Sequence, residues 1–415
     1  MDKYSARKGR TVLTFKDAQG NLLKNARVHA ELVNHEFLFG TGAFFTCEMR
    51  DKTPKSEYYE NVWNDWKQVF NYATLPFYFG RFEPEKGKPL TESRRFAVDL
   101  LRGADKAVKG HPLCWHTLVP DWMYGMSAKE TFEYVLMRIE RDVGAFKDGI
   151  RFWDVINETV IMPNFTNEPA GTPGMNPITN LCREMGRVPL VKALFHAAHE
   201  ADKNATLLIN DFVTSDEYAD LIRDYLDAGV EIDCIGIQSH QHQGEWGLEK
   251  LDTVTRRFEQ FGLPIHYTEN TFVSGHLMPP EIVDLNDYKV DEWPSTEEGE
   301  QYQKERLREM AEYLFSRPLV KAFTNWNFED HQWLKAPSGL IRSDGSPKPS
   351  LLWLKNKLAT DWHTSEDLVT DENGVCPLEG FRGEYRLTCG EKSADFTLNG
   401  KEAQVVTVGW RRHSC

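Results

Sequence analysis

The chain has 415 residues, 40% of them hydrophobic and 27% charged, which argues against disorder and suits one large domain with a small additional module. The formal net charge is −14 and no basic stripe is visible, so nucleic-acid binding is disfavoured and a neutral or weakly charged substrate is expected. No run reaches the ~18 apolar residues of a membrane span, so no membrane partner is expected.

The first ten residues are polar and lack the apolar centre of a signal peptide. The protein is therefore either intracellular or a mature form whose leader has been removed. The compartment stays open, and we favour a secreted or periplasmic location over a cytoplasmic one. The oligomeric state also stays open, with a monomer favoured.

Short alternating segments at both ends of the chain predict β-strands. Residues 27–33 alternate near the N-terminus and residues 381–388 alternate in the tail, where Asn399-Gly400 is typical of a hairpin turn. Neither end has enough residues to build a core alone. We therefore predict that segments 1–36 and 363–415 co-fold into one small accessory β-sandwich.

Between residues 37 and 362, short apolar strands alternate with longer helical stretches, a pattern typical of parallel βα units. Eight such units predict an α/β fold of the (β/α)8 TIM-barrel type. The predicted strands are 37–43, 68–74, 110–115, 150–157, 206–211, 233–239, 264–268 and 320–326. The main predicted helices are 91–109, 128–146, 189–201, 216–229, 247–261 and 296–316.

Two glutamates stand where the active site of a barrel is expected, at the C-terminal ends of strands. Glu158 follows the apolar run 153–156, and Glu269 follows the run 264–268. Two carboxylates so placed suit glycoside hydrolysis, in which one group holds a proton while the other is ionised. Other polar residues follow neighbouring strands and complete a polar rim: His116, Asn210, Asp211, Gln238, Ser239, His240, Asn325 and Asn327.

The motifs around these residues occur in a definite order. Trp153-Asp154-Val155-Ile156-Asn157-Glu158 is followed by Gly236-Ile237-Gln238-Ser239-His240 and then by Thr268-Glu269. His111, Trp115-His116, Pro120 and Trp122 precede these motifs, and Trp326, Asp330 and Trp333 follow them. In this order the chain resembles glycoside hydrolase family 10, the family of retaining endo-β-1,4-xylanases, over about residues 37–360.

The resemblance implies a retaining β-glycosidase acting on a plant polysaccharide, without cofactor or metal. Glu158 matches the general acid/base and Glu269 the nucleophile. Asn157 matches the residue that contacts the sugar 2-hydroxyl, and His240 matches the partner of the nucleophile. The residues that the resemblance places around the same sugar, or as aromatic platforms, are Trp115, His116, Gln238, Trp326 and Trp333.

The segment after the second strand departs from the family pattern. The family usually has Thr-x-Glu-Asn-x-x-Lys-Trp there, whereas this chain places Pro76, Phe77 and Gly80 near the Glu, Asn and Lys positions. Phe77, Tyr78, Phe79 and Arg81 would offer an apolar, partly cationic wall instead. Recognition on the glycone side is therefore expected to be rebuilt, and another β-linked glycan or a decorated unit is an alternative substrate.

Two long segments follow the glutamates. Residues 162–188 are rich in Pro and Gly and are predicted to cover the aglycone side. Residues 270–296 carry several acids, and a solvated loop is the simpler interpretation. The predicted aglycone cover includes Pro169, Gly171 and Pro173.

Structural roles are open for several of these residues. The two glutamates could instead form barrel salt bridges, His116 could be a core histidine and Trp115 could pack under the site. His111, placed at a strand start, and Asp154 are expected to be structural. Asn210 and Asp211 fit either role.

Two other functional classes compete with the glycosidase. His240-Gln241-His242 is a His-x-His pair of the kind used in metal-dependent barrels, although His242 is expected to point outward. A non-catalytic carbohydrate-binding barrel is the other alternative, suggested by the altered segment. The seven cysteines contain no Cys-x-x-Cys pair, which disfavours a zinc knuckle, and only Cys376 and Cys389 suggest a disulfide.

Overall fold

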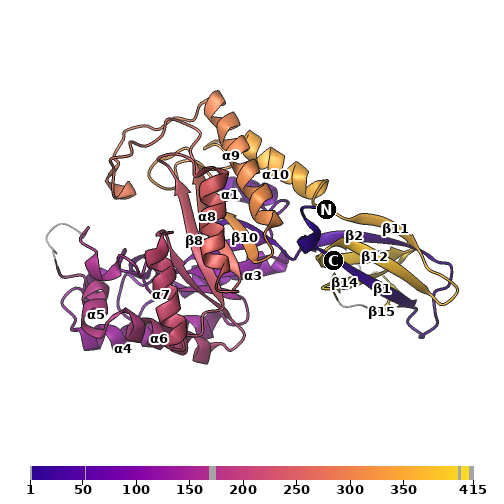
Figure 1. The fold of residues 1–415 in the computed structure, drawn as a ribbon, viewed down its shortest axis with the longest axis horizontal. Coiled ribbons are helices and arrows are strands. Elements are labelled where there is room, and N and C mark those ends of the chain that lie inside the picture. The colour runs from indigo at the N-terminus through magenta and orange to yellow at the C-terminus, as the bar shows by residue number, and fades with distance from the viewer. Residues whose placement is uncertain (1, 52, 168–173, 401–402, 411–415) are drawn as a thin grey trace.

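A computed structural model of the protein describes residues 2–51, 53–167, 174–400 and 403–410. Eight parallel strands form a closed barrel in the order β10-β3-β4-β5-β6-β7-β8-β9, with helices around it (Figure 1). This confirms the predicted (β/α)8 fold. The barrel strands are β3 (Leu38–Gly42), β4 (Tyr72–Pro76), β5 (Ala107–His111), β6 (Phe152–Asn157), β7 (Thr206–Asp211), β8 (Cys234–Gln241), β9 (Ile265–Phe272) and β10 (Val320–Asn325).

The six predicted helices all form. They are α3 (Thr91–Gly103), α4 (Ala128–Phe146), α6 (Arg187–Ala201), α7 (Asp216–Asp227), α8 (Gly247–Glu259) and α9 (Glu297–Ser316). The sequence reading missed four further helices: α1 (Pro54–Trp66), α2 (Phe79–Phe82), α5 (Pro177–Met185) and α10 (Pro349–Ala359). Short 3-10 turns lie at Ser5–Arg7, Phe44–Glu48, Asp121–Met123, Met162–Asn164 and Leu285–Asp287.

Two barrel strands lie elsewhere than predicted. The second begins at Tyr72 rather than at 68, because the chain up to Phe70 closes the last turn of α1, where the Phe70 amide donates to the Trp66 carbonyl. The third strand is Ala107–His111 rather than 110–115. Pro112 interrupts it, and the apolar residues beyond Pro112 are buried beside β6 as a loop.

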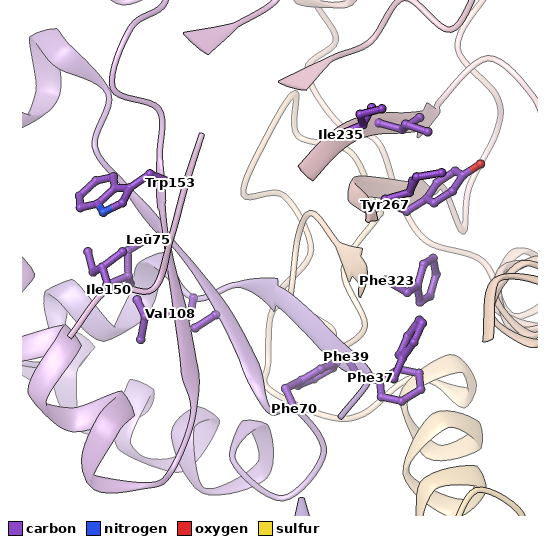
Figure 2. Close-up of a cluster of buried hydrophobic side chains, with 14 of the residues drawn as sticks. Phe37, Phe39, Phe70, Leu75, Val108, Ile150, Trp153, Ile235, Tyr267 and Phe323 are labelled. Atoms are coloured by element: carbon purple, nitrogen blue, oxygen red, sulfur yellow. The ribbon is translucent and has the colours of Figure 1, made fainter. Parts of the chain in front are cut away.

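Large apolar side chains fill the space between the barrel and its helices. Figure 2 shows Trp153, Leu75, Ile235, Tyr267 and Phe323 projecting from different barrel strands, and all five are buried. Strand β6 is buried along nearly its whole length, as expected for a parallel strand covered on both faces. All five belong to one hydrophobic cluster, which holds the strands that carry the polar rim.

The two ends of the chain form two small sheets beside the barrel (Figure 1). One has the order β12-β1-β15 and the other the order β11-β2-β13-β14-β16, so N-terminal strands pair with C-terminal strands in both. A Cβ at Gly9 would lie 3.4 Å from the Leu398 side chain, so the sheets face each other. The strands are β1 (Lys8–Lys16), β2 (Arg27–His35), β11 (Ser365–Val369), β12 (Val375–Phe381), β13 (Gly383–Cys389), β14 (Lys392–Leu398), β15 (Ala403–Thr407) and β16 (Gly409–Trp410).

This arrangement confirms the accessory β-sandwich built from both chain ends. We keep 1–36, 37–362 and 363–415 as proposed domain boundaries. The turn at Asn399-Gly400 is not a hairpin turn, because β14 and β15 lie in different sheets and β15 pairs with β1 in parallel. Among the described cysteines, Cys376 and Cys389 are free thiols, so the suggested disulfide is wrong.

A buried arginine joins the sandwich to the barrel. The Arg7 side chain donates hydrogen bonds to the main-chain carbonyls of Leu314, Phe315, Arg317 and Val320, at the end of α9 and the start of β10.

No helix of the described residues is both long and apolar enough to span a bilayer.

Candidate active site

Glu158 and Glu269 are brought together by two buried asparagines. The side-chain amide of Asn210 donates to Glu269 Oε1 at 2.7 Å and to Asn157 Oδ1 at 2.8 Å. Asn157 in turn donates to Glu158 Oε1 at 3.0 Å. Thr268 Oγ1 donates to Asn210 Oδ1 at 2.6 Å and fixes its orientation. One continuous network therefore links both carboxylates across the strands β6, β7 and β9.

Glu158 stands just beyond β6 in the left-handed region of backbone conformation, with φ of 60°. Its carboxylate accepts hydrogen bonds from Gln238 Nε2 at 3.1 Å and from Trp115 Nε1 at 2.8 Å. Burial and then the charge of Asp211 raise the pKa of Glu158 to about 8, against these hydrogen bonds. The group therefore holds a proton at neutral pH.

Glu269 has the same burial but the opposite charge state. Burial alone would raise its pKa, but the hydrogen bond from His240 Nε2, 3.2 Å from Glu269 Oε2, and the neighbouring basic side chains together outweigh burial. His111 and Lys109 lower the pKa of Glu269 in the same direction as this hydrogen bond. The pKa of Glu269 is therefore below its usual value, and this carboxylate is ionised at neutral pH. The two glutamates differ as an acid and a nucleophile must.

Asn210 and Asp211, for which the sequence left the role open, both contribute. Asn210 joins the two glutamates. Asp211 accepts hydrogen bonds from the backbone amides of Val160 and Val213, each at 3.0 Å. Burial raises the pKa of Asp211 to about 7, and its charge in turn acts on Glu158. Only the fold could show this, because Asp211 has no motif signal of its own.

A buried polar cluster of three side chains lies inside the barrel near Glu269. Asp154 sits 2.7 Å from Lys109 Nζ and 2.7 Å from His111 Nδ1, and all three side chains are buried inside the barrel. These contacts agree with the structural role expected for Asp154. His111 was placed wrongly at the start of a strand. It is the last residue of β5, and its ring packs 5.2 Å from the Trp326 ring.

The predicted aromatic residues lie around the same site. Trp326 is buried between His111 and Phe44, with ring centroids 5.2 Å and 5.6 Å away. Trp333 is half-buried, and its ring lies 4.8 Å from that of His240. His116 packs 4.3 Å from Phe165, and burial lowers its pKa to about 3, so its imidazole is neutral. Its Nε2 is 3.8 Å from Glu158 Oε2.

The predicted wall after β4 contains fewer side chains than expected. Phe77 is fully buried against Phe82, Phe146 and Trp153, and Phe79 packs on Trp122. Both therefore belong to the core. This part of the prediction is wrong, because the chain turns inward into α2 directly after the strand. Tyr78 and Arg81 are the members of the wall that remain beside the site, with the Tyr78 ring 5.8 Å from that of Trp115.

The loops after the glutamates meet each other. Asn167 donates to the Asp284 carboxylate, so the segment after β6 reaches the segment after β9. The acids of the second loop are mostly exposed, but Val273, Met278, Trp293 and Ala336 pack as a small core beneath them. The segment 270–296 therefore has a small core of its own and is more than a solvated loop. Pro169, Gly171 and Pro173, part of the predicted aglycone cover, lie outside the described residues.

The His-x-His pair does not act as a unit. His242 is buried rather than pointing outward, with its ring 5.2 Å from Trp333, and burial lowers its pKa to about 3. Of the pair, His240 alone contacts a catalytic-site carboxylate. Within the described ranges, no cluster of three or more His, Cys, Asp and Glu side chains could hold a metal ion.

Comparisons with known proteins agree on one family for this chain. The model of glycosyl hydrolase family 10 matches residues 46–357. Endo-1,4-beta-xylanase B of Paenibacillus barcinonensis is 27% identical over 272 residues, which cover 62% of this chain and 76% of that protein. Anti-sigma-I factor RsgI6 of Acetivibrio thermocellus is 25% identical over 403 residues, 92% of this chain and 45% of that protein.

Solved structures agree on the fold. A family 10 structure from Paenibacillus barcinonensis superimposes with a TM-score of 0.62 at 22% identity, covering 78% of this chain and 96% of that one. The family model spans well over half of the chain and includes both glutamates. The chain therefore belongs to glycosyl hydrolase family 10 and is a glycoside hydrolase.

Proposed function

We propose that the protein cleaves a β-linked plant polysaccharide with retention of configuration, most closely in the manner of an endo-1,4-β-xylanase. The observation that carries this proposal is the opposite protonation of two buried carboxyl groups, Glu158 and Glu269, in one hydrogen-bond network. The names of relatives such as xylanase B of Paenibacillus barcinonensis support xylan as the first substrate to try.

The proposed reaction has two displacements. In the first, Glu269 attacks the anomeric carbon and Glu158 gives its proton to the departing glycosidic oxygen, which forms a glycosyl-enzyme ester. In the second, the ionised Glu158 takes a proton from water, whose oxygen attacks the same carbon and releases Glu269. His240 and Asn210, each bound to one oxygen of Glu269, hold the nucleophile in position.

The other predicted contacts are proposals of the same kind. Asn157 is part of the hydrogen-bond network between the two carboxylates and is proposed to contact the sugar 2-hydroxyl. Gln238 and Trp115 are proposed to orient Glu158, which they contact. The remaining proposed contacts with the substrate are made by His116, Trp326, Trp333 and Arg81.

A second substrate class is favoured by one specific observation. Pro76, Phe77 and Gly80 supply no polar side chain where the family usually grips the distal sugars, and Phe77 is fully buried. A β-linked glycan other than unsubstituted xylan is therefore the alternative substrate.

Two variants test the mechanism on xylan and on aryl β-xylosides. Glu158→Gln should slow the hydrolysis of substrates with poor leaving groups by about 10²–10⁴-fold, because the acid is lost. Aryl glycosides with activated leaving groups should keep their first step. Glu269→Ala should abolish both reactions. An equal loss on both substrate types in Glu158→Gln would contradict its assignment as the acid.

A further inference from the structure

The short helix α2, which carries Arg81, is locked onto the neighbouring loop by close backbone contact. The amide of Gly80 donates to the Leu118 carbonyl at 2.7 Å. A Cβ at Gly80 would lie 2.8 Å from that same carbonyl oxygen, so no larger residue fits without a shift. The loop that contains Leu118 also carries Trp115. The backbone of Arg81 is therefore held at a fixed place relative to the active site.

Tyr78 links Arg81 to the catalytic centre. The guanidinium of Arg81 lies 5.9 Å from the centroid of the Tyr78 ring. That ring packs in turn 5.8 Å from Trp115, whose indole nitrogen donates to Glu158. Burial and the charge of Glu269 raise the pKa of the Tyr78 hydroxyl, and the charge of Arg81 opposes them. A chain of ring contacts and one hydrogen bond therefore connects Arg81 with Glu158 through Tyr78 and Trp115.

The cation of Arg81 is exposed and has no acidic partner within the described part of the chain, where no carboxylate oxygen lies within 4.0 Å of it. Its acidic neighbours in sequence are already paired. These pairs are Glu83 with Arg141, Glu85 with Lys88 and Glu92 with Arg50. A guanidinium resting on an aromatic face keeps its outer N–H groups free to bind a ligand.

We propose that Arg81 binds the carboxylate of an acidic sugar unit of the substrate, which rests on the proposed glycosidase function. A carboxylate is the group that a guanidinium binds through two parallel hydrogen bonds. Pro76 and Phe77 offer no polar side chain in the same segment, so Arg81 is the cationic side chain that this segment offers to a ligand. The net charge of −14 does not prevent this, because charges beyond a Debye length of ~8 Å are largely screened.

The test compares matched xylo-oligosaccharides: neutral, bearing a uronic acid branch, bearing a terminal uronic acid, and with each carboxyl reduced to an alcohol. The wild type should show a kcat/KM roughly tenfold or more higher on one acidic substrate than on its reduced form. Arg81→Gln should erase this preference by lowering kcat/KM on the acidic substrate far more than on its reduced form, and Arg81→Lys should retain part of the preference. Arg10→Gln, an exposed arginine of β1, serves as the matched control.

The two acidic substrates distinguish a branch from a terminal unit as the source of the carboxylate. An equal loss on acidic and reduced substrates in Arg81→Gln, or no preference in the wild type, would overturn the proposal. If none of the oligosaccharides is hydrolysed, the proposed function is contradicted, while the proposal about Arg81 is decided by binding. Calorimetric binding of the same acidic and reduced oligosaccharides to wild type and Arg81→Gln then decides on Arg81 alone: selective binding supports the proposal, and its absence overturns it.

Discussion

At the scale of single residues, two chemically identical side chains of the candidate active site differ in pKa because their surroundings differ. Glu158 is buried beside the acidic Asp211, whereas Glu269 is buried beside His240 and near Lys109 and His111. Burial pushes both pKa values upward, so the neighbouring charges decide which carboxyl keeps its proton. Sequence spacing alone cannot show these neighbours.

The role of Asp211 leads to a prediction about the pH profile. The alkaline limb of kcat/KM should report loss of the Glu158 proton near its pKa of about 8. Asp211→Asn removes a negative charge that raises this pKa, so the alkaline limb should move to lower pH while the acidic limb stays. A fall in rate without a shift of the limb would mean that Asp211 is only structural. Asp224→Asn, exposed on α7, is the control.

The raised pKa of Glu158 also predicts how stability depends on pH. In the folded protein its pKa is about 8 rather than 4.5, so between these values the folded state holds a proton that the unfolded state has lost. The free energy of unfolding therefore falls as pH rises through this window. Glu158→Gln removes the titration, so its Tm advantage over the wild type should grow from pH 5 to pH 8 in calorimetry. A constant difference would contradict the assigned pKa.

At the scale of elements, the periodic pattern identified the barrel strands but misplaced two of them. Apolar residues continue past the end of β5 into Leu113 and Cys114, which are buried as a loop beside β6. A window of apolar residues cannot distinguish a strand from a buried loop. The misplaced strand put His111 at the start of a strand, although it is the last residue of β5. Helix α2 was missed because a single turn has no measurable period.

Two glycines should respond differently to replacement by alanine, because only the one in β5 is closely packed. A Cβ at Gly110 would lie 2.1 Å from the Trp153 ring, which is buried and cannot move away. Gly110→Ala should therefore lower the free energy of unfolding by at least about 1–3 kcal/mol, the usual cost of overpacking. Gly144→Ala in α4 meets no atom within 4 Å and should be neutral or slightly stabilising. Urea denaturation of both variants measures the difference, and equal effects would refute the packing argument.

At the scale of the whole molecule, the sandwich is attached to the barrel by buried groups. Arg7 binds four barrel carbonyls, and Trp362 packs 4.3 Å from Phe315 and 5.8 Å from Tyr4. The attachment lies at the N-terminal end of β10, away from the strand ends that hold the proposed catalytic residues. The sandwich therefore supports the barrel without entering the active site.

Loss of this attachment should affect stability more than catalysis. Arg7→Ala leaves buried carbonyls without donors, at a cost of about 1–3 kcal/mol for each group left unsatisfied. Thermal unfolding should begin at a lower temperature, while kcat/KM at 25 °C on the best substrate stays near the wild-type value. Arg10→Ala, exposed on β1, should change neither quantity. A large loss of kcat/KM in folded Arg7→Ala would mean that the sandwich shapes the site.

The sequence by itself determined the barrel, the co-folding of the two chain ends and the two glutamates, because strand periodicity and motif order are local properties of the chain. The tertiary structure alone decided that Asn210 joins the carboxylates, that Asp211 raises the pKa of Glu158, and that Phe77 turns inward while Arg81 faces outward. These features depend on contacts between residues far apart in the chain. Burial and charge in a closed barrel act through space, and their effect on each pKa follows from the fold.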